Sequence, residues 1–228
     1  MDRDIDRKDS KQKGYSEYLL CQRCESLFSS WERELRNFFA CVQKRKGNTK
    51  ISIETQCDLG KRKLHKISGL NYRFVKLGLL SILWRLSLSK VEHFLDYDLG
   101  PVHQEKVRRI LDNSEYLLEN EYWTAITVGT MEHDAHLGFQ SFHKKKRILG
   151  QRFQLYTICA TTIYIRVASN SDKLPDGLKN FGLREDGTVL VLETDLADSI
   201  VKNKSTLDRL NRPDVVKMFG DVYKYFKK

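Results

Sequence analysis

Apolar residues recur at three- and four-residue steps between residues 24 and 43, and this spacing places them on one face of an α-helix. The remaining surface is charged and includes Glu32 and Arg36. A helix of this kind buries its apolar face against another part of the chain. The pattern therefore predicts an amphipathic helix that docks on the core. Its apolar stripe consists of Phe28, Trp31, Leu35, Phe38 and Phe39.

A second apolar run, from Phe74 to Leu86, covers most of the circumference of a helix. Asn71 precedes this run, and asparagine is a favoured N-cap residue. We expect this helix at the centre of the core. It contains Lys76 and Arg85 and is too short and too charged to cross a bilayer, so no membrane is expected as a partner.

A third helix is predicted where Gly100 is followed by Pro101, because proline is favoured at the first helical position. It is expected to end near Asn113. Its expected apolar face consists of Val102, Val107, Ile110 and Leu111.

The second half of the chain is rich in Val, Ile, Thr and Tyr, which favour strands. We predict strands at residues 122–131, 154–158, 161–168 and 188–193. Residues 44–70 are expected to form a basic connector with one edge strand at the sequence ISIETQC. A short helix is expected near residues 195–204, and a closing helix begins near Pro213.

Helices followed by strands are typical of the α+β class. The sequence predicts an N-terminal helical part with a Cys-x-x-Cys turn, then a mostly antiparallel β-sheet with a C-terminal helix. The chain has 228 residues, 40% of them hydrophobic, which is enough to form one compact domain. Residues 1–14 are expected to be a mobile polar arm, residues 15–112 the helical part and residues 113–228 the strand-rich part. The cysteine number is odd and no apolar leader segment follows Met1, so we expect a cytoplasmic protein.

The formal charge of +10 favours an anionic partner, and nucleic acid is the first candidate. Clustered Lys and Arg side chains can contact phosphates in a way that depends on salt and not on sequence. An equally open interpretation is that the clusters are solvated loops of a basic protein. The candidate contacts to a DNA or RNA backbone are Lys44, Arg45, Lys46, Lys61, Arg62, Lys63, Lys144, Lys145, Lys146 and Arg147.

Cys21 and Cys24 form a Cys-x-x-Cys pair at the start of the first helix. Two thiolates at this spacing can bind one zinc ion, but a closed structural site needs four ligands. The other two could come from Cys57, from His65 or from a partner chain. The alternative is that Cys24 packs as a small apolar residue of the stripe. Cys41 and Cys159 lie among apolar neighbours and are expected in the core.

His133, Asp134 and His136 follow the strand predicted at residues 122–131. Imidazole and carboxylate groups at a strand end could bind a transition metal or act as an acid–base pair. Short charged segments between strands are more often solvated turns, so these residues are weak catalytic candidates. No glycine-rich phosphate loop and no nucleophile elbow is present in the sequence.

Three segments together resemble a bacterial family of mostly uncharacterised proteins related to HNH-type endonucleases. The segments are YLLCQRCE with SSWERELRNFF, NYRFVKLGLLSILWRLSLS, and LGPVHQEKVRRIL. The resemblance covers roughly residues 15–112, with a fainter similarity at residues 138–169. In that family a first cysteine pair and a His-Ile-Pro-like segment precede the second cysteine pair, which Cys21 and Cys24 match. The resemblance implies a zinc knuckle formed by the two pairs, with the histidine serving the nuclease chemistry.

The first cysteine pair and the motif histidine are absent, since none of the first fourteen residues is Cys or His. HNH chemistry needs a histidine base and a divalent cation. We therefore expect catalysis by this chain alone to be absent, and a divalent metal only if a partner or missing residues complete a nuclease site. Three explanations stay open: a lost nuclease half, a start inside a longer gene, or completion of the site by another chain.

Two functions follow from these observations. The first is a nucleic-acid-associated protein related to HNH endonucleases, whose binding should weaken steeply with salt. The alternative is a non-enzymatic protein-interaction module of a bacterial phage-defence or toxin-type system. A tight protein partner and indifference to DNA would favour the second.

Overall fold

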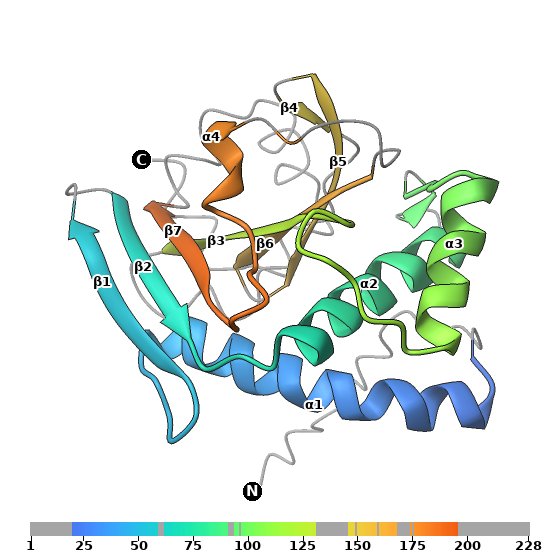
Figure 1. Ribbon diagram of the computed structural model, residues 1–228, viewed down its shortest axis with the longest axis horizontal. Helices are drawn as coiled ribbons and strands as arrows, with labels where there is room; N and C mark the ends of the chain where they lie inside the picture. The colour runs from blue at the N-terminus through green and yellow to red at the C-terminus, as the bar shows by residue number, and fades with distance from the viewer. Residues whose placement is uncertain are drawn as a thin grey trace, which may run out of the picture.

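The computed structural model describes residues 20–58, 62–90, 94–95, 97–130, 146–148, 150–158, 160–167, 174 and 176–195 (Figure 1). Several predictions lie outside these residues. They are the N-terminal arm, the core position of Cys159, the short helix beyond Asp195 and the closing helix from Pro213.

Helix α1 spans Gln22–Lys44 and confirms the first predicted helix. Its five predicted stripe residues are all buried. Helix α2 spans Tyr72–Leu88, and the side chain of Asn71 caps it by accepting a hydrogen bond from the Phe74 amide at 3.2 Å. The two helices pack closely at Gly78, where a Cβ atom would lie 2.7 Å from Cδ1 of Leu35. A glycine in the middle of α2 therefore allows α1 to approach.

Helix α3 spans Pro101–Asp112 and begins at the predicted Gly100–Pro101 step. Val107 is buried, as are Ile110 and Leu111. Val102 is 76% exposed, so its assignment to the apolar face is wrong. It lies in the first turn of α3, where the side chain points away from the core.

The described strands form one sheet in the order β1-β2-β7-β3-β6-β5-β4. Neighbouring strands are antiparallel except β3 and β7, which are parallel, so the α+β class with a mostly antiparallel sheet is confirmed. The four predicted strands correspond to β3, β5, β6 and β7. The strands are β1 Ser52–Asp58, β2 Arg62–Ser68, β3 Thr124–Thr130, β4 Lys146–Ile148, β5 Gln151–Ile158, β6 Thr161–Arg166 and β7 Val189–Asp195.

The edge strand predicted at ISIETQC is confirmed as β1, but residues 44–70 contain a second strand, β2, which forms an antiparallel hairpin with it. Strand β2 lies inside the sheet, between β1 and β7. Its sequence RKLHKIS lacks the regular apolar alternation of a half-buried strand, and its buried residues are His65 and Ile67. Strand β4 was also missed, because it begins within a run of basic residues at a sheet edge.

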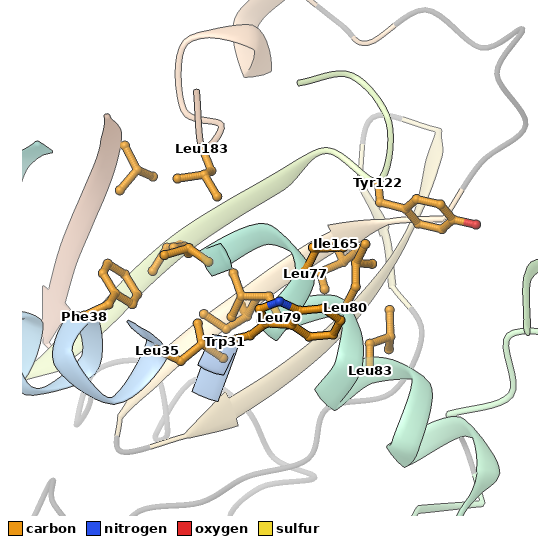
Figure 2. Close-up of a cluster of buried hydrophobic side chains, with 14 of the residues drawn as sticks. Trp31, Leu35, Phe38, Leu77, Leu79, Leu80, Leu83, Tyr122, Ile165 and Leu183 are labelled. Carbon is orange, nitrogen blue, oxygen red and sulfur yellow. The ribbon is translucent and has the colours of Figure 1, made fainter. Parts of the chain in front are cut away.

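Helices α1 and α2 cover one face of the sheet, and their buried side chains join those of β2, β3, β6 and β7 in one core (Figures 1 and 2). In Figure 2, Trp31 and Leu35 of α1 lie beside the leucines of α2. The hydroxyl of Tyr156 donates to the carbonyl of Leu79 at 2.9 Å and ties β5 to α2. A smaller cluster around Trp123 packs with the short helix α4, Asp176–Lys179.

Candidate nucleic-acid interface

Arg45 ends helix α1 in a left-handed conformation, with φ 47°. The Lys46 amide donates to the carbonyl of Cys41 at 3.2 Å, and the Arg45 amide to that of Val42 at 3.3 Å. These two bonds form the Schellman motif, whose left-handed position is usually glycine. An arginine here both reverses the chain toward β1 and gives the helix end a long cationic side chain.

The Arg45 side chain contacts a buried carboxylate on strand β7. Its Nε lies 3.3 Å from Oε2 of Glu193, and the same oxygen lies 2.5 Å from Nε2 of His65 on β2. Nδ1 of His65 lies 3.2 Å from Oγ1 of Thr55 on β1. Since a carboxylate only accepts hydrogen bonds, Nε2 of His65 carries the donated proton, and Nδ1 of a neutral ring accepts from the Thr55 hydroxyl.

His65 is 6% exposed and Glu193 is 9% exposed. A buried carboxylate is stable only when partners replace its water, and here one carboxylate oxygen has two. The Glu193 network, which we define as Thr55, His65, Glu193 and Arg45, therefore fixes the end of α1 against strands β1, β2 and β7.

The Glu193 network brings the first two basic clusters together. Lys63 lies opposite Glu193 in the β2–β7 register, on the same face of β2 as His65. Because Arg45 contacts the same glutamate, the backbone of its neighbours Lys44 and Lys46 is held close to this point. We call Lys44, Lys46 and Lys63 the helix-end surface. Arg62 belongs to the same cluster, but strand alternation places it on the opposite face of β2.

Charge is concentrated in this part of the chain. Residues 44–68 contain eight Lys and Arg residues against two acidic ones, which accounts for six of the ten net positive charges. Lys44 and Lys46 are exposed and make no ion pair in the part of the chain that the structure describes. Lys63 is half-buried and lies 3.4 Å from the exposed carboxylate of Asp58. Lys61 lies outside the described residues.

The third basic cluster is remote from the first two. Lys146 and Arg147 are exposed on β4, at the sheet edge opposite the hairpin. Five strand spacings separate β4 from β2, or about 24 Å. Lys144 and Lys145 lie outside the described residues.

Cys21 and Cys24 lie at the other end of α1. Cys21 is the N-cap residue and is exposed, and its Sγ lies 3.4 Å from that of Cys24 in the first turn. Hydrogen bonding from the backbone amide of Cys24, and then from its thiol, lowers the pKa of the Cys21 thiol. The hydrogen bond to Cys21, together with burial, raises the pKa of Cys24.

The ligands considered for a zinc ion are not near this pair. His65 contacts Glu193 and Thr55 at the C-terminal end of α1, and Cys57 follows two residues after Thr55. The 23 residues of α1 separate the two ends by about 34 Å. Among the described residues, no group of three or more His, Cys, Asp or Glu side chains could hold a metal ion. His133, Asp134 and His136 lie outside those residues. Cys41 is buried, as predicted.

A buried lysine was not singled out by the sequence pattern. Lys76 of α2 is 1% exposed, and its Nζ lies 3.4 Å from the carbonyl oxygen of Glu119 and 5.6 Å from the ring centre of Tyr72. Burial lowers its pKa to about 7. A neutral amine is a nucleophile, but an amine this deeply buried is closed to substrates, so we assign it no catalytic role.

The Glu193 network was also missed, although the sequence of β7 contains a signal for it. Val189 and Val191 point into the core, and Glu193 continues the same period of two. A carboxylate at an inward position of a strand requires a partner. That partner could not be named from the sequence, because His65 precedes Glu193 by 128 residues.

No protein family matches this chain, and neither the curated proteins nor the solved structures contain a match. No helix within the described residues has both the length and the apolar character of a transmembrane span.

Proposed function

We propose that the protein binds the phosphate backbone of nucleic acid through the helix-end surface, Lys44, Lys46 and Lys63. The observation that carries this proposal is the Glu193 network, which holds two cationic segments of the chain side by side. Arg45 serves the surface indirectly, because its guanidinium is engaged by Glu193. The proposal concerns binding only.

A fixed cationic surface binds phosphates better than the same lysines on a mobile loop, because less freedom is lost on binding. Lys44 lies in the last turn of α1, and the Lys46 amide belongs to the Schellman motif, so both side chains begin from ordered backbone. Lys66 on the opposite face of β2 is a poorer candidate. It lies near Asp186, whose pKa is lowered mainly by hydrogen bonds from Thr188, with a smaller contribution from the charges of Arg184 and Lys66.

The relationship to HNH endonucleases remains part of the proposal, and it is supported by the three sequence segments that resemble that family. In this proposal the protein is the binding part of a nuclease-related system. Zinc at Cys21 and Cys24 would require ligands from a partner chain or from residues outside those described.

The experiment is a salt titration of binding to a fluorescent duplex DNA and to a single-stranded RNA of equal length. Each phosphate contact that is removed should reduce the slope of log K against log salt by about one. For the nucleic acid that the wild type prefers, the magnitude of this slope should therefore be smaller by about three in the triple variant Lys44→Gln, Lys46→Gln, Lys63→Gln.

Two matched variants locate the surface. Arg62→Gln with Lys66→Gln changes the opposite face of the hairpin, and Lys146→Gln with Arg147→Gln changes the far sheet edge. Both should retain the wild-type slope. If either removes more affinity than the triple variant, the helix-end surface is the wrong location. If wild type binds neither nucleic acid at low salt, the nucleic-acid proposal fails and a protein partner becomes the function to test.

A further inference from the structure

Cys21 and Cys24 can form a disulfide with each other without any further ligand. A structural zinc site needs four donors, and no third donor joins Cys21 and Cys24 among the described residues. A disulfide needs only the two sulfur atoms. These are 3.4 Å apart, and a disulfide bond is about 2.05 Å long.

The local backbone allows the sulfur atoms to close this gap. Cys21 has extended dihedral angles, φ −80° and ψ 162°, and stands just outside the helix, while Cys24 lies within the first turn. Rotation about the side-chain bonds of Cys21 can therefore bring the sulfurs together while the hydrogen bonds of α1 stay in place. We propose that Cys21 and Cys24 form a reversible disulfide site, with Cys21 as the attacking thiol and Cys24 as the resolving thiol, and that it exchanges with small disulfides such as glutathione disulfide.

The two thiols differ in the way that these roles require. Cys21 is exposed, whereas Cys24 is half-buried. The amides of a helix N-terminus stabilise a thiolate, and the thiolate is the species that attacks a disulfide.

The reaction balances as two exchanges. The Cys21 thiolate attacks one sulfur of glutathione disulfide, the S–S bond breaks, and one glutathione leaves as a thiolate. Cys24 then loses its proton to solvent and attacks the sulfur of Cys21. This step forms the Cys21–Cys24 bond and releases the second glutathione. Two electrons pass from the protein dithiol to the glutathione pair, and the two thiol protons end on the released glutathione.

Cys57 provides a matched comparison because it is exposed but has no cysteine neighbour in the described part of the chain. It can form a mixed disulfide with glutathione, but nothing beside it can resolve that bond. Cys41 is buried and should not react in the folded protein.

The experiment uses the full chain, treated with a chelator and equilibrated in buffers of increasing glutathione disulfide. The protein is then acid-quenched, unfolded and labelled with a maleimide. The reduced chain has five thiols to label. Closure of the site should remove two labels with no glutathione on Cys21 or Cys24, although Cys57 can take up one glutathione. Cys57→Ser, which starts from four thiols, should fall to two labels with no added glutathione mass.

Trypsin identifies the bond because Arg23 lies between the two cysteines. Without reductant, cleavage after Arg23 should leave peptides 14–23 and 24–33 joined, and reductant should separate them. The Cys24→Ser variant should instead accumulate one glutathione on Cys21, since the resolving thiol is gone. Its far-UV circular dichroism should match wild type, which confirms that the variant folds.

Two results would overturn the proposal. One is a wild-type chain that keeps all its thiols, or only gains glutathione, at the most oxidising ratio. The other is a linkage that joins either cysteine to Cys57. Neither result bears on nucleic-acid binding, because the pair lies at the opposite end of α1 from the helix-end surface.

Discussion

The two ends of α1 differ in the range of their contacts. At the C-terminal end, Arg45 reaches Glu193 on a strand from the other half of the chain, and His65 joins them. At the N-terminal end, Cys21 meets Cys24 within one turn of the same helix. The first arrangement ties distant segments together, so changing it should alter the stability of the fold. The second is local and exposed, so it can change its chemical state while the fold stays the same.

The largest loss of stability is expected from a substitution in the middle of α1, because this part of the helix is packed into the core. Trp31 is 2% exposed and packs against Phe28 and the α2 side of the core. Trp31→Ala should reduce the free energy of unfolding by about 3–5 kcal/mol, through lost burial and the cavity left behind. Urea unfolding measures this change. Arg33→Ala, at an exposed position of the same helix, should change stability by less than about 0.5 kcal/mol, and equal effects would contradict the assigned orientation of α1.

Glu193→Gln tests the C-terminal end. The substitution keeps the shape of the side chain but removes the charge that Arg45 and His65 share. We expect a loss of about 2–3 kcal/mol in unfolding free energy, because hydrogen bonds to a charged group are worth more than neutral ones. Glu54→Gln on the exposed face of β1 is the matched control. A loss no larger than that of the control would show that the network does not hold α1 to the sheet.

Lys76→Met tests a second buried charged group. Unlike Arg45, Lys76 has no ion pair with a carboxylate among the described residues. The pKa of Lys76 in the folded protein is about 7, below its ordinary value of 10.5. Between these pH values the unfolded chain binds more protons than the folded one, so this group makes stability rise with pH. Below pH 7 the folded protein bears the full cost of burying the ammonium group.

We therefore expect Lys76→Met to be more stable than wild type by about 1–2 kcal/mol at pH 6, since lost contacts to Tyr72 and Glu119 offset part of the gain. Since the wild type gains about 1.4 kcal/mol per pH unit between pH 7 and pH 10, the difference should vanish near pH 8 and reverse above it. Chemical unfolding at several pH values checks both statements. A variant that is less stable at pH 6 would show that the contacts of the ammonium group outweigh its desolvation.

The smallest change in stability is expected from substitutions at the N-terminal end of α1. The double variant Cys21→Ser, Cys24→Ser should change the free energy of unfolding by less than about 0.5 kcal/mol, because the pair is at the surface. Thermal unfolding with and without a chelator, together with elemental analysis for zinc, makes this test specific. About one zinc per wild-type chain, lost in the variant along with several kcal/mol, would instead establish a closed metal site.

Helices α1, α2 and α3 could be predicted because their signals lie within a few residues of one another. The apolar period of α1, the Asn71 cap and the Gly100–Pro101 step each act locally. Strand β2 could not be predicted in the same way. Its inward position is occupied by His65, which is acceptable there only because Glu193 and Thr55 satisfy both ring nitrogens.

For the helix-end surface too, the sequence predicts one part and the tertiary structure decides the other. The basic clusters are visible in the sequence, but their spacing does not indicate which of them meet. The structure joins the clusters at residues 44–46 and 62–63 and leaves Lys146 and Arg147 at the far edge of the sheet. The order of the strands decided this, since β7 pairs with β2 on one side and β3 on the other.

The sequence by itself determined helices α1, α2 and α3, five of the strands, the α+β class and the closeness of Cys21 to Cys24, because backbone geometry relates residues a few positions apart. Only the tertiary structure decided that Glu193 meets Arg45 and His65, that Lys76 lies in the core, and that two basic clusters share one surface. Those outcomes depend on which distant segments pack together. A side chain is buried only when helices and sheet are assembled, so the free energy of its burial cannot be assigned to one segment of the sequence.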